Sequence, residues 1–298
     1  MGRWSDSVRI TKTVLRTLRE DRALLVLPLL SGLCMIAAAA VLFVPLLLAF
    51  LLNPSGLIAF ATSMGGRTVL AILALVLYFV LVFLSNFFFA ALIGAATIKL
   101  GGRTATVRDG LQIASSKLGR LVVWSLIAGT VGLLIRLIAS RFKGIVGLLI
   151  AVGAGISWSV ATYFVLPVIL YEENTAWRSL VRSAKLFTTT FGRWFFSNLL
   201  LGLLVAGIFL LGVIPFIAGI LLLGSSTGLG LGLLLLGVIV WIFALVFSTT
   251  VNGIMRAVLY RYATTGQIDP AMAPSTLPPH SYFASTIPPP PPLPSSSG

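Results

Sequence analysis

Long runs of apolar residues, separated by short polar segments, dominate the chain. A helix needs about 20 predominantly apolar residues to cross ~30 Å of hydrocarbon, and none of these runs shows the period-two alternation of a transmembrane β-strand. The pattern therefore predicts an all-α polytopic membrane protein with six transmembrane helices in a membrane domain of residues 23–262. The predicted spans are residues 23–52, 68–98, 121–140, 145–171, 194–223 and 229–255.

A different pattern lies between the fourth and fifth runs, at residues 174–187. Apolar side chains recur there at spacings of three and four, so they share one helical face. The basic side chains fall together on another face. A short basic amphipathic helix of this kind is typical of a segment that lies flat on a cytoplasmic membrane surface. The predicted contacts for lipid head groups are Arg178, Arg182 and Lys185.

Residues 1–22 carry a similar basic amphipathic pattern ahead of the first run. Arg9, Lys12 and Arg16 lie on its basic face and are further predicted head-group contacts. The alternative is a soluble helix that packs on other loops. A weaker segment, residues 106–118, precedes the third run. The chain is thus either a threefold repeat of surface helix plus membrane hairpin, or three segments that resemble one another by chance.

Glycine and proline punctuate the later part of the chain. Gly212 and Pro215 interrupt the fifth run, so we expect a broken or kinked helix there. From residue 263 the composition changes to proline and serine, with five consecutive prolines at 288–292. Residues 263–298 are therefore predicted to form a disordered tail of polyproline II character. The tail is the expected contact for a partner protein.

The basic residues indicate the orientation. Of the 21 Lys and Arg residues, 17 fall at the two ends and in the loops after the second and fourth runs, and four fall on the opposite side. By the positive-inside rule, both termini lie in the cytoplasm and the protein resides in the cytoplasmic membrane.

Composition agrees with a membrane location. Of the 298 residues 58% are hydrophobic and 9% are charged, whereas soluble domains carry about 25% charged residues. The net charge of +14 arises from bases that flank apolar runs and do not form one exposed face, which argues against nucleic acid and favours anionic lipids as partners.

The sequence offers little chemistry. Its one histidine, His280, lies in the predicted tail, its seven acidic residues lie outside the apolar runs, and it has one cysteine. We therefore expect no catalytic residue, no metal site and no cofactor. Three asparagines in the runs either bond neighbouring helices or line a polar pathway; they are Asn86, Asn198 and Asn252. The leading hypothesis is a non-enzymatic protein that organises lipid or partner proteins, and the alternative is a small-solute transporter or channel.

Two segments carry family resemblances. Residues 18–32, together with residues 158–167, resemble an uncharacterised prokaryotic integral-membrane family, domain of unknown function 6159. Residues 175–186, ahead of residues 191–194, are similar to a cytoplasmic motif found in several bacterial membrane families, including the membrane domain of some glycerophosphodiester phosphodiesterases. The first likeness covers about residues 1–262. Neither brings catalytic residues with it, and phosphodiesterase activity is not implied.

Overall fold

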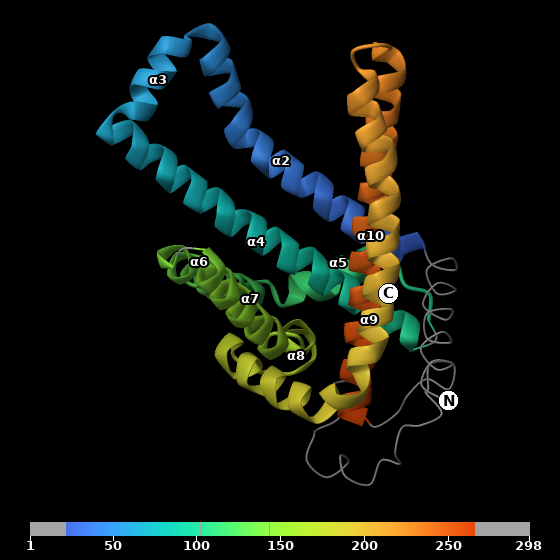
Figure 1. Cartoon of the computed structure of the whole chain (residues 1–298). Helices are drawn as coiled ribbons and strands as arrows, with labels where there is room; N and C mark the ends of the chain where they lie inside the picture. Colours follow the sequence, from blue (N-terminus) through green and yellow to red (C-terminus); the bar gives the residue numbers. More distant parts are fainter. Residues whose placement is uncertain (1–21, 102, 143, 266–298) are drawn as a thin grey trace. The chain divides into compact units, whose positions relative to one another are not determined.

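The structure is a computed structural model that describes residues 22–101, 103–142 and 144–265. These residues form helices and short connections, with no strand among them (Figure 1). Six helical segments of the described chain are long and apolar enough to cross a membrane. The predicted all-α polytopic membrane fold is confirmed, and the protein is a multi-pass integral membrane protein.

The elements follow the predicted order of hairpins. They are α2 (Arg22–Leu52), α3 (Pro54–Thr62), α4 (Met64–Leu100), α5 (Val107–Ser116), α6 (Leu118–Arg141), α7 (Gly144–Ala161), α8 (Val165–Tyr171), α9 (Ala176–Leu222) and α10 (Thr227–Thr265).

The chain divides into two compact units. Unit 1 comprises Met1–Pro28, Ala95–Val107 and Lys185–Gly298, and unit 2 comprises Leu29–Gly94 and Arg108–Ala184. Long helices such as α4 and α9 therefore pass from one unit into the other.

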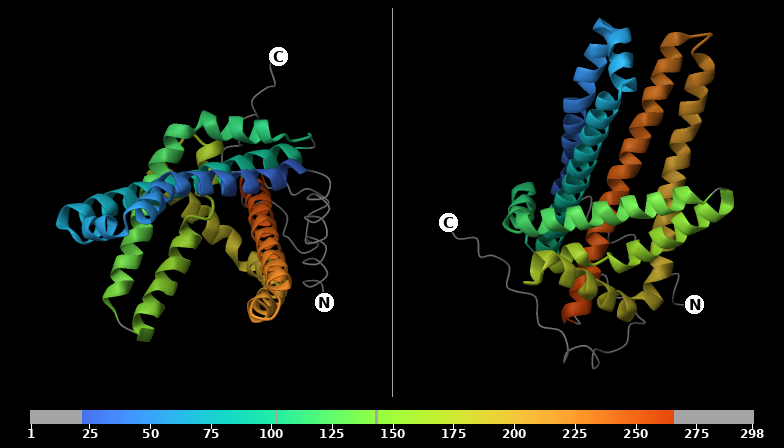
Figure 2. Two further views of the ribbon diagram at one scale, coloured as in Figure 1. Left: turned by 90° about the horizontal axis from the view of Figure 1, so that it is seen from above. Right: turned by 90° about the vertical axis from the view of Figure 1, so that its left-hand side faces the viewer.

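The main feature of unit 1 is the antiparallel hairpin of α9 and α10, whose two helices lie side by side in every view (Figure 2). Glycines bring the two backbones close together. A Cβ atom on Gly219 would lie 2.8 Å from the carbonyl oxygen of Gly230. Nearer the middle, the Trp241 ring stacks on Phe209 at 5.3 Å and its indole N–H donates to the Phe209 carbonyl at 3.1 Å. Small residues and aromatic wedges thus fix this hairpin without charged groups.

Unit 1 also ties the base of α10 to short pieces of α2 and α4. The Thr250 hydroxyl donates to the Leu24 carbonyl at 3.4 Å, and Thr250 and Leu24 are both fully buried. The Arg261 guanidinium donates to the carbonyl of Leu100, the last residue of α4. A cation at a helix C-terminus satisfies an orphan carbonyl and complements the helix dipole.

α9 joins two segments that the sequence predicted as separate elements. The predicted surface helix at 174–187 is not a separate element, because α9 runs unbroken from Ala176 to Leu222. At Gly212 and Pro215 the helix is not broken, since Pro215 lies inside the continuous α9, and the alternative of a kink at this proline stays a prediction. Proline removes a single N–H donor, and a membrane helix packed tightly on a neighbour tolerates that loss.

Unit 2 contains the hairpin of α2 and α4, which α3 closes, and the hairpin of α6 and α7 (Figure 1). Gly129 of α6 faces α4, where a Cβ atom would lie 2.7 Å from the Phe79 ring. The Tyr78 hydroxyl donates to the Gly129 carbonyl at 3.0 Å. The rings of Trp124 and Trp158 stack at 6.0 Å and join α6 to α7.

The fourth predicted span, 145–171, is broken. α7 ends at Ala161, a turn follows, and α8 begins at Val165. Pro167 lies in the first turn of α8, where its missing N–H needs no intrahelical partner. A helix that begins just before Pro167 keeps its hydrogen bonds, which an unbroken helix through that proline does not.

Several predicted boundaries fall beyond the described chain. The predicted N-terminal helix, 1–22, and the predicted tail, 263–298, lie almost entirely outside the described residues. α10 runs to Thr265, past the predicted end of the membrane domain at 262. The threefold repeat stays a prediction. The two surface segments that the structure does describe differ, because α5 is a separate helix whereas the other segment is the start of α9.

Candidate functional site

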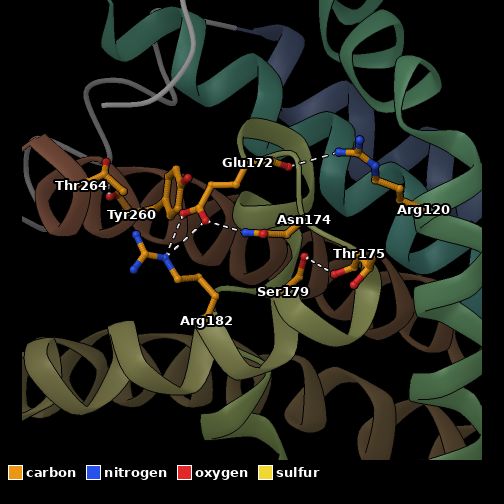
Figure 3. Close-up of polar contacts among 8 residues, drawn as sticks. All are labelled: Arg120, Glu172, Asn174, Thr175, Ser179, Arg182, Tyr260 and Thr264. Carbon is orange, nitrogen blue, oxygen red and sulfur yellow. Dashed lines mark hydrogen bonds and ion pairs between the residues drawn. The ribbon is translucent and has the colours of Figure 1, made fainter. Parts of the chain in front are cut away.

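Polar side chains of unit 2 gather where α8 connects to α9, and Figure 3 draws Arg120, Glu172, Asn174, Thr175, Ser179 and Arg182 among them. Every residue of α8 is buried. The helix ends at Tyr171, and the next residue, Glu172, caps it by donating its backbone N–H to the Val168 carbonyl at 2.8 Å. Glu172 therefore stands at the exit of a buried helix, four residues before α9 begins.

The Glu172 carboxylate is the centre of this cluster. It receives the Nε–H of Arg182 at 3.3 Å and the side-chain amide of Asn174 at 2.8 Å. The side chains of Arg182 and Glu172 are 22% and 14% exposed. Because the pair is partly withdrawn from water, its attraction is screened less than that of a surface ion pair.

A second arginine binds the same residue through the backbone. Arg120, near the start of α6, donates its Nη1–H to the Glu172 carbonyl at 3.2 Å. Glu172 is thus bound by groups from α6, from the α8–α9 connection and from α9. One residue fixes three elements that meet at the base of the α6–α7 hairpin.

Two serines one turn apart complete the contact between α8 and α9. Ser179 and Ser183 are fully buried. The Ser183 hydroxyl accepts the backbone N–H of Phe164 at 2.9 Å, at the break before α8. The Ser179 hydroxyl donates to the Thr175 carbonyl at 3.0 Å within its own helix. Small side chains at this spacing let α9 approach the turn closely enough for the Ser183 bond to form.

The first turns of α9 therefore have two faces. The buried face carries Ala176, Ser179 and Ser183. On the exposed side Trp177 is 63% exposed and Val181 46% exposed, beside the exposed Arg178. We call Trp177, Arg178 and Val181 the α9 surface.

The structure separates the three basic residues that the sequence grouped together. Arg178 and Lys185 are exposed, whereas Arg182 turns to Glu172. The head-group role of the three stays a prediction, and Arg182 has a protein partner that sequence reasoning missed. The available signal was the pair of serines that flanks Arg182, because small polar residues one turn apart favour a buried helical face.

The remaining predicted residues have other settings. The Asn86 amide donates to the Ser125 hydroxyl at 3.2 Å, which joins α4 to α6. The Asn252 amide donates to the Ser248 carbonyl at 2.8 Å within α10. Asn198 lies in α9, but its side chain is outside the described part of the structure. Arg9, Lys12 and Arg16 also lie outside the described residues.

The chemistry of the cluster is that of positioning. It holds one carboxylate and no histidine, and no group of three His, Cys, Asp or Glu side chains suited to a metal ion occurs among the described residues. The arrangement joins the start of α9 to α6 and α8 through the bonds of Glu172 and Ser183.

Comparison with known proteins places the chain in a sequence family. A family model described as a family of unknown function (DUF6159) matches residues 64–269, which is more than half of the chain. The match includes Glu172, Arg182 and both buried serines. No curated protein matches the chain, and no solved structure matches it. The predicted likeness to the membrane domain of glycerophosphodiester phosphodiesterases is unconfirmed.

Proposed function

The chain belongs to DUF6159, a family of unknown function, and from this premise we propose that it is a non-enzymatic protein that organises anionic lipid in the cytoplasmic membrane. Both termini lie in the cytoplasm in this proposal, as the distribution of basic residues favours. The α9 surface is the proposed lipid contact.

The observation that carries the proposal is the exposure of Trp177 beside Arg178. An indole ring 63% exposed is costly in water and favourable at the head-group layer, where aromatic side chains concentrate. An adjacent arginine attracts anionic lipid by about 1 kcal/mol at such a surface. The two side chains together match the chemistry of a membrane interface.

The polar cluster supports the proposal by fixing this surface. Arg182 pairs with Glu172 and so joins the first turns of α9 to the α8–α9 connection, whereas Arg178 is exposed and available for the proposed lipid contact. A helix held by buried serines on one side presents its opposite side without further ordering cost.

The transport alternative has less support. Asn86 and Asn252 both bond protein groups, Ser125 in one case and the Ser248 carbonyl in the other. These bonds favour a structural role in helix packing. The proline-rich tail remains a proposed contact for a partner protein, because polyproline II segments bind aromatic-lined grooves at low entropic cost.

Tryptophan fluorescence in vesicles tests the proposal. The full-length protein is reconstituted with brominated phosphatidylglycerol or brominated phosphatidylcholine, and the signal of Trp177 is obtained as the difference between wild type and Trp177→Phe. We expect stronger quenching by the anionic lipid, and Arg178→Gln should remove that preference. The control is Arg141→Gln, at the tip of the α6–α7 hairpin. Equal quenching by the two lipids would overturn the proposal.

A further inference from the structure

The tip of the α2–α4 hairpin, residues 51–68, contains α3 and the helix ends beside it (Figure 1). It carries exposed apolar side chains and one charged residue. α3 has no buried residue. Leu52 is 85% exposed and Met64 87% exposed. The other exposed large apolar residues of the tip are Leu51, Ile58 and Phe60. A loop that lies in water rarely shows such an apolar surface, so the surroundings of this tip have to be identified.

Both breaks in the helical chain are closed by side chains. At the first, the Asn53 side-chain oxygen accepts the backbone N–H of Gly56 at 2.9 Å. At the second, the Ser63 hydroxyl accepts the backbone N–H of Gly66 at 3.0 Å. Gly66 is required there, because a Cβ atom would lie 1.8 Å from the Phe60 carbonyl oxygen. Internal satisfaction of backbone groups is what a low-dielectric surrounding demands.

Hydroxyl groups of the tip donate to backbone carbonyls of the tip itself. The Thr62 hydroxyl donates to the Ile58 carbonyl at 2.8 Å, and the Ser63 hydroxyl donates to the Phe60 carbonyl at 2.7 Å. The Thr68 hydroxyl donates to the Met64 carbonyl at 2.9 Å. These bonds satisfy the hydroxyl donors within the tip, which lowers the cost of placing it in an apolar surrounding.

The one charged residue of the tip is Arg67, and it is placed at the C-terminus of α3. Its Nε and Nη2 atoms donate to the Thr62 carbonyl at 3.1 and 2.7 Å. This capping complements the partial negative charge of the helix end. The Nη1 donors remain for an outside acceptor, and a lipid phosphate is the acceptor that suits a guanidinium best.

Length and continuity indicate which surrounding the tip meets. The span Leu24–Leu52 has 29 residues, which is about 44 Å of helix at 1.5 Å per residue. A bilayer including its head groups is about 40–45 Å thick. The apolar windows of α2 and α4 run directly into the tip from both sides. The first span is therefore long enough for the tip to reach the head-group layer of the leaflet opposite the start of α2.

We propose that the α3 tip is a lipid-interface anchor: α3 lies at the boundary between acyl chains and head groups, its apolar side chains point into the leaflet, and Arg67 binds lipid phosphate. The hairpin thus ends in phospholipid and not in an aqueous loop. The proposed anchor uses none of the residues of the α9 surface. Its test is therefore independent of the test of the proposed function.

Spin labelling of the full-length protein in phospholipid vesicles tests the anchor. In a Cys34→Ala background, a nitroxide is attached at Ile58→Cys or Phe60→Cys, and collision rates with oxygen and with a water-soluble nickel complex are measured. The matched control is Arg141→Cys, at the charged tip of the α6–α7 hairpin. We expect the ratio of oxygen to nickel collisions to be several-fold higher at Ile58 and Phe60 than at Arg141.

Two results would overturn the anchor. Nickel collisions as frequent as at Arg141 would place the tip in water. Low collision rates with both reagents would show that protein, such as a second copy of the chain, covers it. For Arg67, we expect Arg67→Gln to shift the depth of the Ile58 label and Arg67→Lys to restore it. An unchanged depth in Arg67→Gln would reduce Arg67 to a helix cap and overturn the phosphate contact.

Discussion

The Ser183 hydroxyl of α9 accepts the backbone N–H of Phe164 at 2.9 Å, across the break between α7 and α8. Both residues are almost completely buried. The bond therefore satisfies a donor that the break removes from regular helical pairing, and it does so from a residue 19 positions along the chain. The break between α7 and α8 supplies the free N–H donor, and Ser183 supplies the acceptor that it needs.

Loss of this acceptor should destabilise the protein. Ser183→Ala leaves the Phe164 N–H buried without its partner, which costs about 1–3 kcal/mol. The measurement is the free energy of unfolding in mixed detergent micelles. The matched control is Ser179→Ala, which is equally buried but loses only a bond within its own helix, so we expect a smaller effect. Equal losses in the two variants would contradict this account.

The ion pair between Glu172 and Arg182 should show energetic coupling. Glu172→Gln and Arg182→Gln each weaken charge-assisted hydrogen bonds and should lower the free energy of unfolding by about 1–3 kcal/mol. Because the two share one interaction, the double variant should lose less than the sum of the single losses. Glu173→Gln, at the exposed neighbouring position, serves as control and should change stability by no more than about 0.5 kcal/mol. Strict additivity would show that the pair contributes nothing of its own.

Close approach of α9 and α10 should make Gly219 sensitive to any side chain. Its Cβ atom would meet the Gly230 carbonyl oxygen at 2.8 Å, and backbone cannot move aside as a flexible side chain does. We expect Gly219→Ala to cost about 1–3 kcal/mol. Gly207→Ala, on the same helix with nothing within 4 Å, should be neutral or gain up to ~1 kcal/mol. Thermal unfolding of the two purified variants in one detergent compares them directly.

Asn86 should behave as a packing residue. Asn86→Leu removes the bond to Ser125 and should cost about 0.6 kcal/mol, the average for such bonds in membrane helices. Ser125→Ala should cost a similar amount, and the two losses should not add. A change in solute flux across vesicles that carry Asn86→Leu, with stability unchanged, would instead favour the transport alternative.

The sequence by itself determined the class of fold, the number of apolar segments and their order. Crossing hydrocarbon is a local requirement, since each helix must satisfy its own backbone and show about 20 apolar residues. For that reason the second and sixth spans, 68–98 and 229–255, follow from the sequence without any tertiary information. The placement of the basic residues at the ends of the runs is likewise read directly from the sequence.

Only the tertiary structure decided which faces are buried and where the helices break. In a membrane, lipid is as apolar as a protein interior, so hydrophobicity does not mark the packed face. Hence Trp177 and Val181, which belong to the apolar residues of segment 174–187, are exposed, whereas Ser179 and Ser183 are buried. The partner of Arg182 is Glu172, which lies ten positions earlier in the chain, outside α9. Such pairings arise from the folded geometry, because neither residue carries a local signal for the other.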